Sequence, residues 1–363
     1  MEREKSKYLR FYEELREEIV RGDWPHGARL PSRRQIAHER GLSVVTVEHG
    51  YELLCQEGYV EARPRSGFYV CYRATDGFAQ AEPEAAARAP RPQAAGEGDA
   101  FPFSVLARAM RKVLADYGEA ILNKSPNTGC LALREALSRY LARNRGIHAG
   151  AGQIVIGSGA EYLYGMVVEL LGNGRVFAIE SPSYAKIEQV YRARGVSCEL
   201  LPLGEDGIQS AALARTGASV LHITPFRSFP SGVTASASKR AEYIRWASER
   251  GRIIVEDDFE SEFSLMRKPE ETVFSHSEGR NVIYLNTFSR TISSAIRVGY
   301  MVLPEPLAGA FDARMGFYSC TVPAFEQYVL TELIESGDFE RHINRIRRRK
   351  RRAQELANGA GEA

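Results

Sequence analysis

The sequence predicts an α/β fold with a mostly parallel sheet, preceded by a small helical domain that carries a β-hairpin. Three observations support this prediction. From Phe101 onward, apolar β-rich runs alternate with helical stretches, a pattern typical of parallel-sheet domains. Residues 1–71 are dense in charge and in residues that begin or end helices. Residues 72–100 are rich in Ala, Pro, Glu and Gly and poor in large aliphatic side chains, so we expect a linker there.

The bulk composition narrows the class of protein. With 363 residues, the chain suits one large domain plus a small one, and its net charge of +2 demands no nucleic-acid partner by itself. The five cysteines are scattered without CxxC spacing, which argues against a disulfide framework and against a metal site. The N-terminus has no apolar signal core and no stretch is long enough to span a bilayer, so we expect a cytoplasmic protein without a membrane partner.

Residues 1–71 have the order of helices expected for a helix-turn-helix. Apolar residues at helical spacing from Tyr8 to Ile19 predict the first helix. Ser32 is a good N-cap for the second, and Gln35 follows three residues later as in a capping box. Ser43 caps the third helix after a short turn that contains Gly, the spacing of a helix-turn-helix.

A β-hairpin is predicted directly after the third helix. Residues 59–63 and 68–70 flank a Pro/Gly turn at 64–67, which makes the hairpin a wing. The segment is nearly neutral overall, but several side chains lie where DNA would contact such a domain. These candidate DNA-binding residues are Arg33, Arg34, Ser43, Thr46, Arg63 and Arg65. The alternative is a small helical bundle whose arginines are merely solvated.

Residues 8–70 resemble the winged helix-turn-helix of the GntR superfamily. The resemblance is carried by Gly27–Arg34, Leu42–Val47, Tyr51–Leu54 and Glu57–Val60. It implies binding to double-stranded DNA. One departure is Val44, because many members have Arg directly after the serine of the third helix.

Several polar residues follow predicted strands of the larger domain. The strand at 153–157 runs into Ser158-Gly159-Ala160 and then a helix at 161–171, a turn that suits a phosphate. The strand at 252–258 ends in carboxylates, and a carboxylate there can pair with a protonated pyridine nitrogen or simply cap the next helix. The hydroxyls and arginines after the strand at 281–286 form a second phosphate-binding pattern.

These features together resemble fold-type-I aminotransferases, and more closely the MocR-type regulators, over residues 101–352. The resemblance rests on Phe101–Ser104, Gly129–Arg134, Ser158–Ala160, Glu256–Asp258, Thr287–Ser289 and Arg297–Tyr300. The resemblance implies pyridoxal 5′-phosphate as cofactor. Its phosphate is expected at Ser158, Gly159, Ala160, Ser289 and Arg297, its pyridine ring against Tyr184 and its ring nitrogen at Asp257. Lys186 matches a position where the family can place a cation for a substrate carboxylate.

The departures from the family's pattern bear on catalysis. The Schiff-base lysine of the Thr-Phe-Ser-Lys motif is Arg290 here, and a guanidinium with a pKa above ~12 cannot form the aldimine. No lysine lies between Lys268 and Lys350. Phe259 replaces a tyrosine, and the loop 224–232 lacks the family's polar residues. The chain also ends shortly after the helix that leads to the family's C-terminal small domain, which we expect to be largely missing.

Three hypotheses follow. The first is a homodimeric transcription regulator without catalytic residues, which binds DNA through residues 1–71 and senses pyridoxal phosphate non-covalently or another small-molecule effector. The second is an active aminotransferase with a DNA-binding appendage, and the third is a non-functional truncated regulator. The basic stretch 341–352 suggests nucleic acid, but its apolar spacing favours a helix with a solvated charged face. We expect residues 353–363 to be unstructured.

Overall fold

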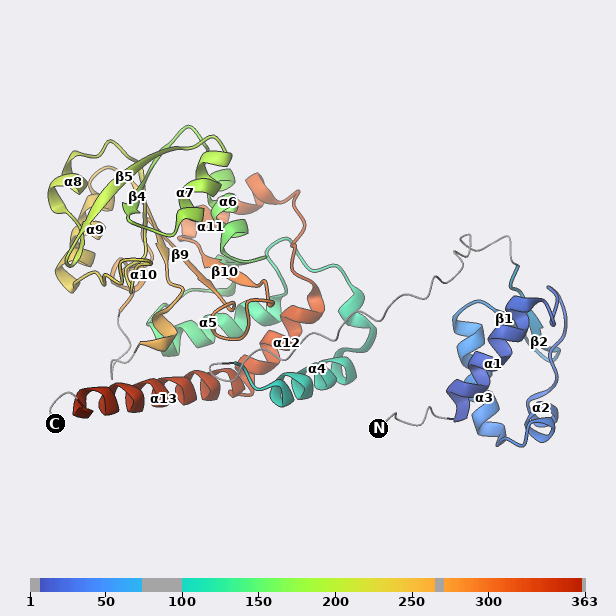
Figure 1. Cartoon of the computed structure of the whole chain (residues 1–363). Coiled ribbons are helices and arrows are strands. Elements are labelled where there is room, and N and C mark those ends of the chain that lie inside the picture. The colour runs from blue at the N-terminus through green and yellow to red at the C-terminus, as the bar shows by residue number, and fades with distance from the viewer. Residues whose placement is uncertain (1–6, 74–99, 265–270, 361–363) are drawn as a thin grey trace. The chain divides into compact units, whose positions relative to one another are not determined.

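The computed structural model describes residues 7–73, 100–264 and 271–360, with side chains described as far as Glu355. The chain divides into two compact units, residues 1–93 and 94–363. Figure 1 shows the elements of each unit in chain order. Because the two units are separate bodies, each is described by itself.

The first unit contains three helices and a hairpin, as predicted. These elements are α1 (Lys7–Arg21), α2 (Arg33–Glu39), α3 (Val44–Gln56), β1 (Val60–Arg63) and β2 (Gly67–Val70). Helix α1 buries Phe11, Leu15 and Ile19, which recur at the 3.6-residue period and pack in one core with α3. Strands β1 and β2 pair antiparallel, with Arg63 opposite Gly67. The winged helix-turn-helix is therefore confirmed as the fold of this unit.

Serine side chains cap both helices of the helix-turn-helix. The Ser32 hydroxyl accepts a hydrogen bond from the backbone N–H of Gln35 at 3.2 Å, and the Ser43 hydroxyl accepts one from that of Thr46 at 3.1 Å. The expected capping box is incomplete, because the Gln35 side chain donates to Glu39 at 3.0 Å instead of returning to Ser32. A capping box would need the amide oxygen of Gln35 to accept from the backbone N–H of Ser32, whereas here a carboxylate one turn along the helix binds the amide nitrogen.

The second unit is built on one eight-stranded sheet. Its strands are β3 (Ile154–Gly157), β4 (Val176–Ser181), β5 (Ser197–Gly204), β6 (Gly207–Ile208), β7 (Val220–Ile223), β8 (Ile253–Asp257), β9 (Val282–Thr287) and β10 (Gly299–Val302). Their order is β3-β10-β9-β8-β7-β4-β5-β6. The pairs from β9 to β5 are parallel, whereas β10 and β6 run antiparallel to their neighbours. This mostly parallel sheet confirms the predicted fold class.

Helices cover both faces of this sheet. They are α4 (Phe103–Tyr117), α5 (Leu131–Arg145), α6 (Ala160–Leu171), α7 (Ala185–Ala193), α8 (Ser210–Arg215), α9 (Ala237–Ser248), α10 (Val273–His276), α11 (Glu305–Met315), α12 (Ala324–Glu335) and α13 (Asp338–Ala360), with 3₁₀ turns at 118–122, 151–153 and 261–263. Alternate residues of each central strand belong to different cores: Ile254 packs with α5 and α12, whereas Val255 packs with α6, α7 and α11.

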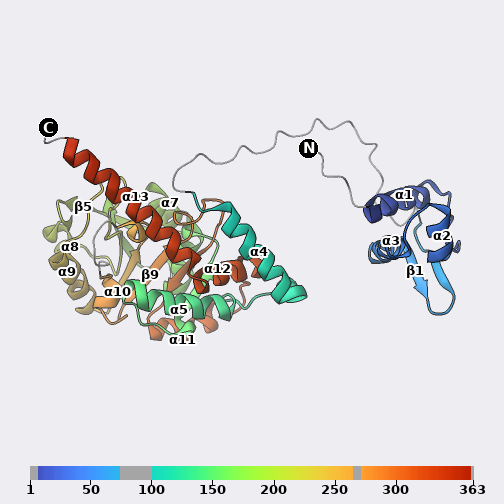
Figure 2. The ribbon, with the colours of Figure 1, turned by 90° about the horizontal axis from the view of Figure 1, so that it is seen from below.

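The final helix departs from the sequence prediction at its end. Helix α13 continues to Ala360, so residues 353–360 are helical where we expected an unstructured tail, and 361–363 lie outside the described residues. Residues 353–357, Ala-Gln-Glu-Leu-Ala, all have a high helix propensity, which explains why the helix continues beyond the predicted end. Figure 2 shows that α13 starts near α4 and α12 and then runs away from them toward the C-terminus. No helix in the described ranges is long and apolar enough to cross a membrane.

Candidate ligand cavity and nucleic-acid interface

A cavity of about 460 Å³ lies where the parallel strands of the second unit end. Its volume is in the range of small-molecule and cofactor sites. It is lined by Ala160, Glu161, Tyr164, Tyr184, Ile187, Thr224, Phe229, Asp257, Phe259, Glu260, Thr287, Ser289, Arg290 and Arg297. Because β4, β7, β8 and β9 are parallel, the segments after them meet at one edge of the sheet, as the rule for open α/β sheets predicts.

Asp257 forms the buried acidic end of this cavity. It is the last residue of β8, its side chain is 5% exposed, and it accepts a hydrogen bond from the hydroxyl of Tyr164. The His222 Nε2 atom lies 3.7 Å from the same carboxylate, and His222 Nδ1 is 2.7 Å from the hydroxyl of Tyr191. Burial, and then the charge of Asp257, raise the pKa of Tyr164, which keeps that hydroxyl a donor. A buried carboxylate held in this way can accept from a protonated ring nitrogen.

The opposite end of the cavity gathers groups suited to a phosphate. Ala160 begins α6, and Ser289 and Arg297 come from the segment after β9. Gly159 has φ +89°, and a Cβ at this position would lie 3.1 Å from a terminal nitrogen of Arg297. Glycine therefore lets the arginine approach the helix N-terminus closely.

Ser158 is placed differently from the other predicted phosphate ligands. It is not among the described residues that line the cavity, and its hydroxyl accepts from the Thr321 hydroxyl at 3.0 Å. A hydroxyl next to a helix N-terminus can turn to either side, and only its tertiary neighbour decides which. Its part in phosphate binding stays a prediction, which requires the hydroxyl to direct its own hydrogen into the cavity.

The sequence analysis did not identify Glu161, which lies in the first turn of α6. Its carboxylate pairs with Arg297 and, at 2.6 Å, with Lys186. The hydrogen bond from Lys186, followed by that from Arg297, lowers the pKa of Glu161. Two cations around one carboxylate leave this end of the cavity with a net positive charge. Lys186, which we expected at a substrate carboxylate, lies outside the described lining residues and is instead engaged with Glu161.

Arg290 occupies the wall of the cavity and forms an ion pair with Glu260. Arg227 lies 3.8 Å from the other oxygen of the same carboxylate. Phe259 lines the cavity beside this pair and offers no hydroxyl. Among the described lining residues none is a lysine, so this wall presents a guanidinium as its strongest cationic group.

Tyr184 supplies an aromatic wall between the two ends. Its side chain is partly exposed at the mouth of the cavity, and its ring meets Phe229 edge-on, with centroids 6.4 Å apart. The Nζ atom of Lys186 lies 5.9 Å from the centre of the Tyr184 ring. Phe229 was not predicted, although it belongs to the loop 224–232 that the sequence analysis marked as unusual.

The candidate DNA-binding residues of the first unit lie on α2, α3 and the hairpin. Ser43 and Thr46 lie at the start of α3, with their hydroxyls 2.8 Å apart. Arg33 pairs with Glu48 on α3, and Arg63 pairs with Glu61 on the same strand. Arg34 and Arg65 are exposed, and Arg65 has φ +62° at the tip of the hairpin. Arg33 and Arg63 thus each already have a carboxylate partner within the first unit.

Family comparisons match both units. Residues 7–70 match the gntR family of bacterial regulatory proteins, and residues 94–362 match the aminotransferase class I and II family. Among curated proteins, the chain is 29% identical to an uncharacterized HTH-type transcriptional regulator YdeL of Bacillus subtilis over 95% of this chain and 77% of that protein. It is 26% identical to the probable rhizopine catabolism regulatory protein MocR of Rhizobium meliloti, with 94% and 74% covered.

Solved aminotransferases share the fold of the second unit. A Pyrococcus horikoshii kynurenine aminotransferase is 26% identical, with a TM-score of 0.61, and covers 68% of this chain and 64% of its own. LysN, an α-aminoadipate aminotransferase of Thermus thermophilus, is 27% identical, with the same TM-score and the same coverage of both chains. The chain thus spans less than two thirds of these enzymes. It belongs to the aminotransferase class I and II family and joins that fold to a GntR-family helix-turn-helix, the arrangement of MocR-type DNA-binding transcription regulators.

Proposed function

We propose that the chain regulates transcription as a homodimer in the cytoplasm, that its second unit binds pyridoxal 5′-phosphate without a covalent bond, and that it catalyses no transamination. The observation that carries this proposal is the Arg290–Glu260 ion pair in the cavity wall. The DNA partner is a property of the GntR-family unit. We infer the cytoplasmic location and the homodimer from the same class of regulator.

The described residues fit a pyridine ring that carries a phosphate. Asp257 would hold the ring nitrogen, and Tyr184 would cover one face of the ring. Arg297, Ser289 and the N-terminus of α6 would hold the phosphate, with Ser158 available if it turns. When bound, pyridoxal phosphate supplies an electron sink and an aldehyde. Asp257 keeps the ring protonated, and the arginine orients the phosphate.

The same residues do not fit covalent attachment. The guanidinium of Arg290 is a delocalised cation at physiological pH, and its nitrogen is a poor nucleophile. Glu260 holds this cation in place as a further obstacle to deprotonation. Arg290 would therefore not attach to the cofactor, and we expect no transamination that begins with an amine at this position. A ligand held in this way can still shift a DNA-binding equilibrium if it binds one conformation better.

The test compares DNA binding and catalysis on the full chain. Genomic fragments selected by the protein define an operator, and the affinity for this operator is then measured with and without pyridoxal phosphate. The proposal predicts a ligand-dependent affinity and no keto-acid product above a protein-free control. Product formation at a steady rate would favour an aminotransferase with a DNA-binding appendage. Rapid complete proteolysis, without a stable fragment near residues 100–350, would favour a regulator that does not fold stably.

A further inference from the structure

We propose that one face of α13 is a second contact for the phosphate backbone of DNA. A groove of about 500 Å³ runs along this helix, and in the described part of the chain it is lined by five residues. These residues, which we call the arginine face, are Arg341, Asn344, Arg347, Arg348 and Arg351. The inference rests on the proposed DNA binding by the first unit.

The charge of α13 is one-sided in sequence and in space. Eight of the twelve residues from Arg341 to Arg352 are Lys or Arg, and none is acidic. The opposite side of the helix is apolar, since Phe339, Ile343 and Ile346 are each at most 4% exposed. Between 341 and 352 every exposed residue except Asn344 is an arginine, whereas a solvated face usually alternates the two signs.

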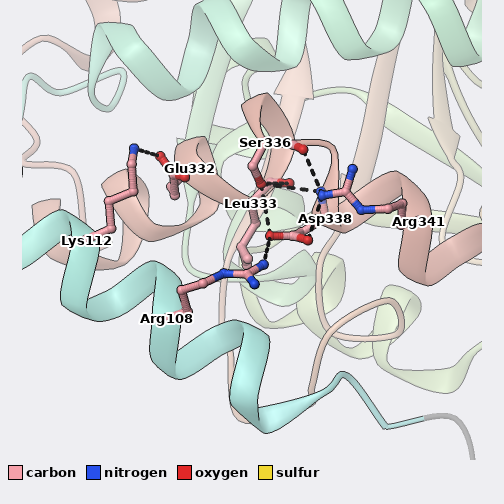
Figure 3. Close-up of polar contacts among 7 residues, drawn as sticks. All are labelled: Arg108, Lys112, Glu332, Leu333, Ser336, Asp338 and Arg341. Atoms are coloured by element: carbon pink, nitrogen blue, oxygen red, sulfur yellow. Dashed lines mark hydrogen bonds and ion pairs between the residues drawn. The ribbon is translucent and has the colours of Figure 1, made fainter.

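The acidic residues of α13 are already engaged at its first turn. Asp338 accepts from Arg108 of α4 at 2.7 Å and from Arg341 at 2.7 Å, as Figure 3 shows together with the neighbouring Lys112–Glu332 pair. Glu340 accepts from Arg143 of α5 at 2.9 Å. These pairs fasten the start of the helix to α4 and α5. Between Arg341 and Gln354, α13 carries no Asp or Glu, so the helix itself supplies no carboxylate beside its cations there.

Two arginines of the arginine face donate hydrogen bonds to backbone carbonyl groups. The Arg347 side chain donates to the backbone carbonyl of Glu262, and the Arg348 side chain donates to that of Asn344 at 3.3 Å. Carbonyl acceptors orient a guanidinium but do not neutralise its charge. Like charges three or four residues apart on a helix repel one another and destabilise it. A polyanion placed along this face would remove that repulsion.

DNA is the polyanion that the rest of the chain favours. Residues 7–73 contain eleven Lys or Arg and ten Asp or Glu, so the first unit has little net charge with which to attract a polyanion. Arg33 and Arg63, two of its candidate phosphate ligands, are occupied by glutamates. The arginine face spans roughly ten residues, or about 15 Å of helix, a length over which B-DNA carries roughly nine charges.

The covalent connection permits both units to meet one duplex. Residues 74–99 separate the described parts of the two units. Twenty-six residues span at most about 90 Å when fully extended. That length is greater than two turns of B-DNA, which rise about 34 Å each. DNA that flanks a site held by the helix-turn-helix is therefore within reach of α13.

The test uses the full chain with Arg348→Gln and Arg351→Gln together. Binding to a labelled random-sequence duplex of about 40 base pairs is followed by anisotropy between about 50 and 200 mM salt. We expect the affinity at about 100 mM salt to fall about tenfold and the slope of log K against log salt to shrink by about 1.8, since each phosphate contact contributes about 0.9. The charge-conserving pair Arg348→Lys with Arg351→Lys should retain most of the affinity.

Matched controls separate this surface from net charge and from stability. Arg215→Gln with Arg250→Gln removes two exposed cations of the same unit away from α13 and should leave the slope unchanged. Thermal unfolding checks that all variants are folded. Equal salt slopes of DNA binding for the α13 variant and this control overturn the inference. The inference is also overturned if the α13 variant loses binding to vesicles of anionic lipid but keeps its DNA binding. If the unsubstituted chain binds no duplex, the proposed function fails as well.

Discussion

Arg290 and Glu260 form an ion pair within the cavity of the second unit, and both side chains line its wall. In the proposed function, this pair stands where the family resemblance places the reactive lysine of an aminotransferase. Glu260 is 17% exposed at its side chain, whereas Arg290 is 54% exposed, so the carboxylate anchors the arginine from the protein side. The remaining wall keeps its acidic end at Asp257 and its basic end at Arg297. Among the described lining residues no lysine is present, which is what the proposed non-covalent binding requires.

Asp257→Asn should weaken pyridoxal phosphate binding about 10- to 100-fold. The substitution keeps the shape but removes the charge that pairs with the ring nitrogen, an interaction worth roughly 1.5–3 kcal/mol. The dissociation constant is measured by fluorescence titration. Inorganic phosphate serves as the control ligand, because its affinity should depend on Arg297 and not on Asp257. An equal loss for both ligands would indicate a collapsed cavity rather than a lost ring contact.

The first unit contains a close helix contact that Gly50→Ala should break. A Cβ at Gly50 would lie 2.5 Å from Cδ1 of the buried Phe11 of α1. Alanine in the middle of a helix normally stabilises by up to about 1 kcal/mol relative to glycine. Here overpacking should reverse the sign and lower the free energy of unfolding by about 1–3 kcal/mol, as measured in urea. Phe11→Leu makes room, so the double variant should lose less than the sum of the single losses.

The fold of both units was predictable from the sequence, but the contacts inside the cavity only in part. Strand periodicity and strand ends were sufficient to predict the α/β sheet, and they led to Asp257, Tyr184 and Arg297, which the structure places around one cavity. The ligand contacts of these residues stay predictions. Ser158 faces Thr321, a neighbour 163 residues away that no local pattern reveals. Glu161 and Glu260 resemble ordinary surface acids until the fold brings arginines to them.

Stability of the second unit should fall as pH rises from about 4.5 to about 8. Burial raises the pKa of Glu180 to about 8, although hydrogen bonds from Ser228 and the Thr224 backbone oppose the shift. Between the unfolded and folded pKa values, the folded chain holds a proton that the unfolded chain releases, so unfolding becomes easier at higher pH. Glu180→Gln should reduce this slope by about 1.4 kcal/mol per pH unit.

Trp246 of α9 can report this unfolding if Trp24 of the first unit is replaced by Phe. Urea titrations of Trp24→Phe, with and without Glu180→Gln, are compared at half-unit steps from about pH 5 to 8. Glu256, whose pKa burial raises to about 7, adds a slope of the same sign in both proteins. Identical slopes in the two proteins would mean that Glu180 ionises normally in the folded state.

Arg33→Ala with Arg34→Ala should weaken DNA binding at every sequence by a similar factor. Both residues lie in the first turn of α2, where a side chain meets phosphates rather than base edges. The salt slope should shrink by up to about 1.8, and by less if Arg33 stays with Glu48. Glu48→Gln releases Arg33 and should raise the affinity. An unaltered slope in the double alanine variant would show that neither arginine contacts DNA.

The most direct test of the central claim is the intact mass of the protein after incubation with pyridoxal phosphate and reduction with borohydride. We predict no adduct on the natural chain and about one adduct per chain on Arg290→Lys, mapped to the substituted position, because lysine restores the missing amine. Arg290→Met should behave like the natural chain, since it supplies no nucleophile. A stoichiometric adduct on one lysine of the natural chain, such as Lys186 or Lys350, would contradict the account and indicate a covalent site.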